Sequence, residues 1–156
     1  MYETIVVPLD GSKLGEAALP YVQELVSALC PGRKVEVILL RVISELTHYA
    51  VATGEAVAIP YTEQELKPIK EEATKYLNKV GQGLESKGAK VRTVVATGDA
   101  AQEIVRIAEE NKASLIAMST HGRSGIAHVV IGSVAEKVMR RTDVPVLMIR
   151  GLKQRK

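Results

Sequence analysis

The alternation of apolar runs with amphipathic helical patterns is the feature that most constrains how this chain can fold. Short runs rich in Val, Ile and Leu predict strands at residues 5–7, 35–42, 91–96, 115–118 and 146–149. Between these runs, apolar residues recur at helical spacing in the segments 14–29, 62–88, 99–108 and from 133 onward. Strands that alternate with helices in this way predict an α/β fold built on a parallel sheet.

The same alternation predicts the topology of the sheet. Parallel strands joined by right-handed helical crossovers form a doubly wound sheet with helices on both faces. We therefore expect a five-stranded parallel sheet in the order 3-2-1-4-5, counted along the chain, which sets the fourth strand beside the first. The 156 residues show no internal repeat and no linker. We expect one domain over residues 1–150 and a basic C-terminal tail over residues 151–156.

Local signals set the helix boundaries. Pro20 predicts either a kink or a late start in the first helix, because a proline inside a helix removes a hydrogen bond. Thr62 followed by Glu65 matches a capping box, and so does Ser133 followed by Glu136. Both pairs therefore predict the first residues of a helix.

Residues 44–61 do not follow the alternating pattern. The segment contains His48, Gly54 and Pro60 and has no clean hydrophobic period. Connections of this length without secondary structure are uncommon, and they are often functional or mobile. We expect a long loop here.

Composition and charge argue against several classes of partner. Hydrophobic residues make up 46% of the chain and charged residues 25%, as is typical of soluble globular proteins. The chain has no Phe or Trp and a net charge of only +3, whereas nucleic-acid surfaces use stacking rings or a strong basic patch. No apolar stretch approaches the roughly 20 residues that cross a bilayer. We expect neither a nucleic-acid partner nor a membrane span.

Cysteine usage and the first residues favour the cytoplasm. Cys30 is the only cysteine, so no internal disulfide can form. The opening Met-Tyr-Glu-Thr includes an acid and precedes no long apolar run, unlike a secretory signal peptide. We expect a cytoplasmic protein in which Cys30 is a small packing residue rather than a nucleophile.

The expected binding site follows from the strand order. Open α/β sheets bind ligands outside the carboxyl ends of their strands, at the point where the strand order reverses. The turn Pro8-Leu9-Asp10-Gly11 leaves the first predicted strand, and the segment that begins at Met118 leaves the fourth. We expect a crevice between these two segments.

A glycine-bearing loop runs from Ser119 to the predicted helix at Ser133. It contains Gly122, Gly125 and Gly132, and glycines let backbone amides approach an oxyanion without a Cβ in the way. The free N–H groups of a helix N-terminus carry about half a positive charge, which favours a bound phosphate. The loop therefore predicts the phosphate site of a nucleotide.

The same loop resembles a known family. Ser119, Gly122 and the pair Gly132-Ser133 are spaced as in the nucleotide-binding members of the universal stress protein family, which have Gly, two residues, Gly, nine residues and then Gly-Ser or Gly-Thr. Ser119 stands in place of the first glycine of that pattern. Further similarities are Val-Pro-Leu-Asp-Gly-Ser at residues 7–12, Leu-Leu-Arg-Val-Ile at 39–43, the turn at Gly98, and Val-Pro-Val-Leu-Met-Ile at 144–149.

The resemblance implies a Rossmann-like fold of the adenine nucleotide alpha hydrolase kind and a stress-response protein that binds ATP. In the ATP-binding branch the first two strands supply the base and ribose end of the site. The fourth strand and its loop run along the nucleotide, and the last helix holds the phosphates. At the base and ribose end, the matching positions with their neighbour Leu9 are Pro8, Leu9, Asp10 and Val42. Along the nucleotide they are, with the neighbour Arg123, Met118, Ser119, Gly122 and Arg123. At the phosphate end they are Gly132, Ser133 and Val134.

The resemblance also implies ligands and an assembly. The expected ligand is ATP, or AMP or another adenine nucleotide, with Mg²⁺ held through the phosphates rather than by protein side chains. Members of the family commonly dimerise through the edge of the last strand. We therefore expect a homodimer through Val146–Ile149, together with a protein partner that the sequence does not identify.

The residues favour binding over rapid catalysis. A Walker A loop needs Gly-Lys-Ser/Thr, whereas Ile131 precedes Gly132-Ser133 here. No second carboxylate accompanies Asp10 in the two crevice loops to hold a metal or to position water. We assign no catalytic role to His121 or His128, and we expect slow ATP hydrolysis or none.

Plainer interpretations stay open at this point. Ser133 could only cap its helix, Asp10 could only form a turn, and the glycines could only permit tight turns in a surface loop. The alternative function is accordingly a dimeric interaction module of the same fold that binds no nucleotide. A nucleotidyl-transferring enzyme of a related fold is disfavoured, because neither a His-Ile-Gly-His nor a Ser-Gly-Gly-x-Asp-Ser motif is present.

Overall fold

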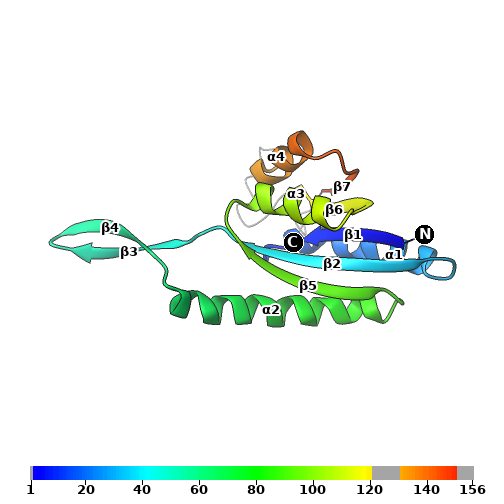
Figure 1. The fold of residues 1–156 in the computed structure, drawn as a ribbon, viewed down its shortest axis with the longest axis horizontal. Coiled ribbons are helices and arrows are strands. Elements are labelled where there is room, and N and C mark those ends of the chain that lie inside the picture. Colours follow the sequence, from blue (N-terminus) through cyan, green and yellow to red (C-terminus); the bar gives the residue numbers. More distant parts are fainter. Residues whose placement is uncertain (1, 121–130, 151–156) are drawn as a thin grey trace, which may run out of the picture.

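A central parallel sheet organises the computed structural model, which describes residues 2–120 and 131–150 (Figure 1). Its strand order is β5-β2-β1-β6-β7, and every neighbouring pair is parallel. Counted among these strands along the chain, the order is 3-2-1-4-5, so the predicted doubly wound topology is confirmed. The strands are β1 (Tyr2–Pro8), β2 (Lys34–Ile43), β5 (Lys90–Thr97), β6 (Leu115–Ser119) and β7 (Val146–Ile149).

Helices cover both faces of the sheet and create two cores (Figure 1). Helices α1 (Leu19–Leu29) and α2 (Glu63–Glu85) pack on one face, and α3 (Ala100–Glu110) and α4 (Ser133–Arg141) pack on the other. Successive residues of one strand serve opposite cores, because side chains alternate across a strand. In β2, for example, Leu39 lies in the first core and Leu40 in the second. This double coverage explains why the central strands are apolar at consecutive positions.

The helix starts follow their sequence signals. The segment after β1 forms a short 3-10 helix, η1 (Gly15–Ala18), and α1 begins only at Leu19 with a proline in its first turn. Pro20 therefore delays the helix rather than kinking it. At α2 the expected capping box is present, since the Thr62 hydroxyl accepts from the Glu65 amide and the Glu65 carboxylate accepts from the Thr62 amide.

The expectation of a long loop over residues 44–61 is wrong. The segment forms an antiparallel hairpin of β3 (Thr47–Ala52) and β4 (Glu55–Pro60), which projects away from the body of the protein (Figure 1). Thr53 and Gly54 form the two-residue turn with φ angles of 53° and 83°, and positive φ at both positions suits the right-handed twist of a hairpin. The hairpin lacks the alternation of apolar and polar residues that marks a half-buried strand, because β4 is exposed at every position.

No helix within the described ranges is long and apolar enough to cross a membrane.

Candidate functional site

The strand order reverses at the carboxyl end of β1. From β1 the chain crosses to β2 on one side, and β6 lies on the other side. The pairing of β1 with β2 extends past Pro8, because the Leu9 amide donates to the Leu40 carbonyl at 2.8 Å. Asp10 therefore begins directly beyond the sheet, where a doubly wound fold presents its ligand site.

The side chain of Asp10 is held in a fixed turn. Its Oδ1 accepts hydrogen bonds from the Ser12 amide at 2.9 Å and from the Ser12 hydroxyl at 2.6 Å. The same hydroxyl accepts from the Gly15 amide at 3.0 Å. A Cβ on Gly15 would lie only 2.3 Å from Oδ1, so no larger residue fits there without displacing the carboxylate. Asp10 therefore does form a turn, and the hydrogen bonds of this turn orient its carboxylate at the edge of the sheet.

A second carboxylate lies close to this turn but is already engaged. The Tyr76 hydroxyl on α2 donates to Glu16 Oε1 at 3.0 Å, and Lys13 Nζ lies 3.1 Å from Glu16 Oε2. Burial raises the pKa of Tyr76, and the hydrogen bond to Glu16 and the negative charges of Glu16 and Asp10 add to that rise. The phenol therefore stays protonated at neutral pH and ties η1 to α2.

The end of β6 is joined to its neighbours through the backbone. Ser119 and Thr120 are each only 8% exposed, although both are polar. The Thr120 amide donates to the Ile149 carbonyl at 2.8 Å, and the Gly132 amide donates to the Thr120 carbonyl at 2.6 Å. The chain that leaves β6 therefore returns to the same point before α4 begins.

The start of α4 differs from the sequence expectation. Gly132 is the N-cap residue and has no side chain with which to cap the helix, and Ser133 is already the first helical residue. The expected Ser133–Glu136 capping box is therefore wrong. Instead, the Glu136 amide donates to the Gly132 carbonyl at 2.9 Å, and the Glu136 carboxylate pairs with Arg140 at 2.9 Å. The first-turn amides therefore receive no cap from their own N-cap side chain and need another acceptor, as the first amides of any helix do.

The predicted site residues that the structure describes lie along this one edge of the sheet. Leu9 and Met118 are buried in opposite cores, so their side chains support the edge from within. Val42 packs against the same core as Met118. Ser133 and Val134 are exposed at the start of α4. Gly122 and Arg123 fall outside the described residues, as do His121, Gly125 and His128.

Sequence reasoning did not identify Ser12 and Gly15 as parts of the site. The Asp10-Gly11-Ser12 turn signal was visible, and Gly11 does have a positive φ of 82°. The close approach of Gly15 to Asp10 depends on how η1 folds back, which no local pattern encodes. Both residues shape the site by fixing another side chain.

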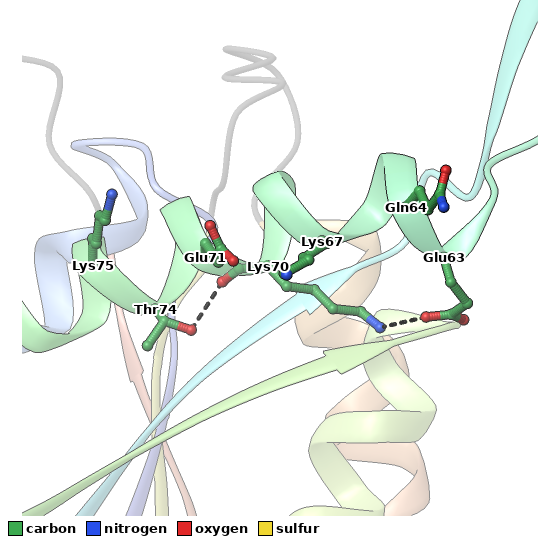
Figure 2. A pocket seen from close by; sticks show the side chains of 7 residues that line it. All are labelled: Glu63, Gln64, Lys67, Lys70, Glu71, Thr74 and Lys75. Carbon is green, nitrogen blue, oxygen red and sulfur yellow. Dashed lines mark hydrogen bonds and ion pairs between the residues drawn. The ribbon is translucent and has the colours of Figure 1, made fainter.

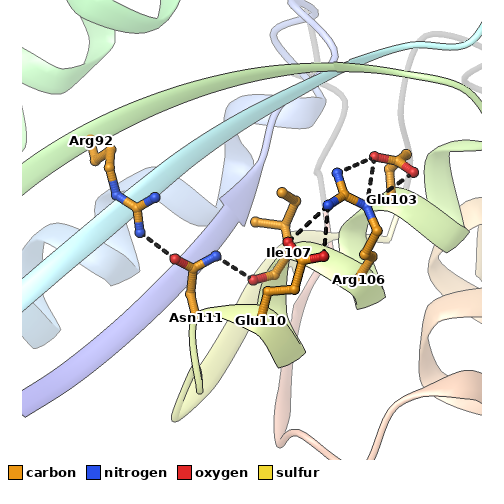
Figure 3. A network of polar contacts seen from close by, with 6 residues as sticks. All are labelled: Arg92, Glu103, Arg106, Ile107, Glu110 and Asn111. Atoms are coloured by element: carbon orange, nitrogen blue, oxygen red, sulfur yellow. Dashed lines mark hydrogen bonds and ion pairs between the residues drawn. The ribbon is translucent and has the colours of Figure 1, made fainter.

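A separate polar network ties α3 to β5, as Figure 3 shows. Arg106 makes hydrogen bonds to Glu103 and Glu110, and these bonds raise the pKa of its guanidinium. Arg92 donates to the side chain of Asn111, which caps the C-terminal end of α3. The charge of Arg106 is neutralised by Glu103 and Glu110 on an exposed surface, so the network is structural.

Within residues 2–120 and 131–150, no group of three or more His, Cys, Asp or Glu side chains could hold a metal ion.

Fold and site together define the class of protein: a Rossmann-like α/β domain in which a glycine-bearing connection joins β6 to α4 at the switch point of the sheet. The sequence model of the Universal stress protein family matches residues 1–150, and the chain belongs to this family.

A relative supports this assignment by both sequence and structure. Universal stress protein MJ0577 of Methanocaldococcus jannaschii is 33% identical over 159 residues, which cover 96% of each chain. Its solved structure superposes with a TM-score of 0.70 at 27% identity and covers 99% of each chain.

Two more distant structures share the fold and were solved with nucleotides. A universal stress protein from Archaeoglobus fulgidus in complex with dAMP has a TM-score of 0.59 at 21% identity, covering 95% of this chain and 98% of its own. A universal stress protein in complex with cAMP has a TM-score of 0.60 at 22% identity, covering 97% of this chain and 98% of its own.

Proposed function

We propose that this chain is a regulatory protein of the stress response that binds ATP, or AMP or another adenine nucleotide, at the carboxyl edge of its sheet. The observation that carries the proposal is the presence of two potential ligand-binding groups at the switch point of the sheet. One is the fixed carboxylate of Asp10 after β1. The other is the N-terminus of α4, where the N-cap Gly132 has no capping side chain and its backbone amide bonds to the end of β6. The fold supports an adenine nucleotide as the ligand class, because it holds dAMP and cAMP in the two distant relatives.

The base and ribose would lie at the ends of β1 and β2. Pro8 and Asp10 border this region on β1, and Val42 borders it on β2. An ionised carboxylate accepts hydrogen bonds only, which suits ribose hydroxyls or the exocyclic amine of adenine. Because Ser12 already fixes one oxygen of Asp10, the ligand would meet an acceptor whose direction is set in advance.

The phosphates would lie at the start of α4. Uncapped first-turn amides carry partial positive charge and favour an anion. Ser133 and Val134 supply such amides at an exposed position, and the φ of −68° at Gly132 is one that any residue can adopt. Gly122 and Arg123 lie outside the described residues, and their part in the phosphate end stays a prediction from the sequence.

The serine that replaces the first motif glycine fits this arrangement. Ser119 is the last residue of β6 and is only 8% exposed. Ala117, two positions earlier, lies in the core beneath α1 and α2, so strand alternation directs Ser119 to that same face. Met118 faces the other core, on the side of α4. The additional side chain would therefore leave the phosphate end unobstructed.

Any Mg²⁺ would be held by phosphate oxygens and water, because the described residues offer no cluster of carboxylates and imidazoles for it. Bound Mg²⁺ neutralises phosphate charge. Slow hydrolysis or none is consistent with the surroundings of Asp10. Glu16, a further carboxylate close to this turn, has one oxygen hydrogen-bonded to Tyr76 and the other paired with Lys13.

Further parts of the proposal concern assembly and location. Strand β7 lies at the edge of the sheet and, among the described strands, pairs with β6 alone. A second copy could extend the sheet at this free edge, which would give a homodimer through Val146–Ile149. The single cysteine suits the reducing cytoplasm.

Isothermal calorimetry of the nucleotide-stripped protein with magnesium ATP, ADP, AMP and cyclic AMP tests the proposal. We expect micromolar binding by the native chain and no measurable heat from Gly132→Glu, because a carboxylate there would occupy and repel the phosphate. Gly132→Ala is the matched control and should still bind, since it adds only a methyl group. Absence of heat with all four nucleotides would overturn the proposal and favour an interaction module that acts through its dimer.

A further inference from the structure

The hairpin of residues 47–60, here called the arm, exposes apolar side chains far from the two cores. Figure 1 shows it extending beyond the sheet as an isolated two-stranded ribbon. Tyr49 is 76% exposed and Val51 79% exposed on β3, while Val57 and Ile59 are 48% and 40% exposed on β4. Isolated hairpins are only marginally stable in water, and they need a further layer for independent stability. The arm therefore has the features of a surface that packs against another one.

One face of the arm is largely apolar, with Tyr49 opposite Ala58 and Val51 opposite Ala56. The other face carries His48 and Glu55 as well as Val57 and Ile59. Edge strands that stay free in solution usually carry lysine or proline, or are bulged. Strand β3 contains neither lysine, arginine nor proline, and its register runs from Thr47 to Ala52 without interruption. Nothing in β3 therefore opposes pairing or packing with another surface.

The base of the arm is fixed to α2. The His48 ring stacks on Tyr61 with centroids 4.8 Å apart, and the Tyr61 amide donates to the Leu46 carbonyl at 2.9 Å. His48 Nε2 also lies 3.9 Å from Glu65 Oε1, the carboxylate of the α2 capping box. The arm and α2 leave this base in opposite directions (Figure 1). The arm is thus held out along a line that continues α2.

A shallow hollow runs along the exposed side of α2, shown in Figure 2. Three lysines and two glutamates contribute, and one lysine, Lys70, pairs with Glu63 at 3.6 Å. Lys67 and Lys75 form no ion pair with any of the described residues. We call this set the α2 hollow: Glu63, Gln64, Lys67, Lys70, Glu71, Thr74 and Lys75.

We propose that the arm lies in the α2 hollow of a second copy of this chain, so that two copies exchange arms about a twofold axis near the arm bases. The lengths agree: six-residue strands span about 20 Å at about 3.3 Å per residue, and α2 from Gln64 to Lys75 spans about 17 Å at 1.5 Å per residue. The opposite directions of arm and α2 allow both contacts to form together. This is the self-complementary geometry of a twofold interface.

Charge favours the same arrangement. Glu55 is the sole carboxylate of residues 47–60, which contain no lysine or arginine, whereas the hollow has more lysines than glutamates. Exchange about the arm bases carries the turn, and Glu55 with it, to the far end of the partner's hollow, where Lys75 lies. The aliphatic stems of the lysines supply apolar surface for Tyr49 and Val51. Twofold symmetry makes this contact twice, which helps to reach the roughly 1,600 Å² of a standard interface.

Disulfide trapping tests the position and direction of the arm. In a Cys30→Ser background, the pair Glu55→Cys and Lys75→Cys should give a covalent dimer on mild oxidation. Glu55→Cys with Gln64→Cys is the matched control and should stay uncrosslinked, because Gln64 lies at the other end of the hollow. Equal crosslinking of both pairs, or none in either, would overturn the proposed seat of the arm.

Light scattering tests whether the arm holds copies together. Tyr49→Asp with Val51→Asp should halve the measured mass, because two charges enter an apolar contact while the body keeps its cores. Tyr21→Asp, at a position 53% exposed on α1, should leave the mass unchanged. The measured mass should be halved in either of two cases. A native dimer would fall to one chain, and a native tetramer that also uses a β7 contact would fall to two. A native protein that has the mass of one chain, or a mass unaffected by the arm charges, would overturn the proposal.

Discussion

The carboxyl edge of the sheet and the arm differ in how their side chains are held. At the edge, hydrogen bonds connect Asp10, Ser12 and Gly15 beneath the turn, and backbone bonds join Thr120 to Ile149 and Gly132. On the arm, Tyr49 and Val51 are more than three-quarters exposed. A ligand would therefore meet side chains and amides already held in place at the edge, whereas the arm needs a second surface to bury its side chains.

The largest effect should separate the core from the arm. Leu39→Ala should lower the free energy of unfolding by about 2–5 kcal/mol, because Leu39 is fully buried in the core beneath α1 and α2. Val51→Ala should change that free energy by at most about 0.5 kcal/mol at concentrations where the protein is monomeric. Urea unfolding measures both. Equal losses would show that the arm is packed as firmly as the core.

Gly15→Ala should damage the edge in particular. The new Cβ would lie 2.3 Å from Asp10 Oδ1, so either the carboxylate or the turn must move. We expect a loss of about 1–3 kcal/mol in the free energy of unfolding from this overpacking, and at least tenfold weaker nucleotide binding by calorimetry. Gly32→Ala is the control, because its Cβ would meet nothing within 4 Å. Unchanged binding by Gly15→Ala would show that the orientation of Asp10 does not matter.

Thr62→Ala should have an intermediate effect at the arm base. Loss of the N-cap should lower the free energy of unfolding by about 1 kcal/mol. In the native chain, hydrogen bonds from the Thr62 amide and hydroxyl hold the pKa of Glu65 below its ordinary value. A lowered folded-state pKa stabilises the protein above the pKa of the unfolded chain, and this stabilisation is lost as pH falls through the folded pKa.

The difference in stability between native protein and Thr62→Ala should therefore shrink on acidification below the ordinary range of a glutamate. Thermal unfolding from pH 7 to pH 3 measures it. Thr47→Ala, at the first residue of the arm and without a cap bond, serves as the control. A constant difference across that range would show that the Thr62 hydroxyl does not stabilise the ionised Glu65 carboxylate.

Ser119→Gly should give the smallest effect. Its side chain shares a strand face with Ala117, away from the proposed phosphate end, so ATP affinity should change by less than about threefold. Glycine within a strand should lower the free energy of unfolding by roughly 0.5–1 kcal/mol. A tenfold or greater gain in ATP affinity would instead show that Ser119 obstructs the nucleotide.

Sequence patterns predicted the buried parts of the molecule well, because buried helices and strands carry apolar residues at characteristic spacings. Strands such as β2 were recognised from continuous apolar residues, and Pro20 marked the late start of α1. The arm was missed because it is exposed on all of β4 and shows no alternation. Thr53 and Gly54 form a turn less recognisable than Asn-Gly or Asp-Gly.

The edge of the sheet on which the candidate residues lie could be predicted from the sequence, but the local geometry at that edge could not. Strand order alone brings Pro8, Val42 and Ser119 to the same edge of the sheet. The Ser133 capping box was wrong because the helix begins at Ser133 itself, with Gly132 as the N-cap. Gly15 lies close to Asp10 because of the path that η1 takes, and the spacing of residues in the sequence does not predict this path.

The central claim is that a nucleotide binds at the carboxyl edge and not on the arm. A two-dimensional ¹H–¹⁵N NMR titration with magnesium ATP tests it most directly, with backbone signals assigned. We expect shifts of the Ser12, Ser133 and Val134 amides, with no change at Val51 and Val57 on the arm. Shifts confined to the arm or α2, or no shifts at millimolar ATP, would contradict it.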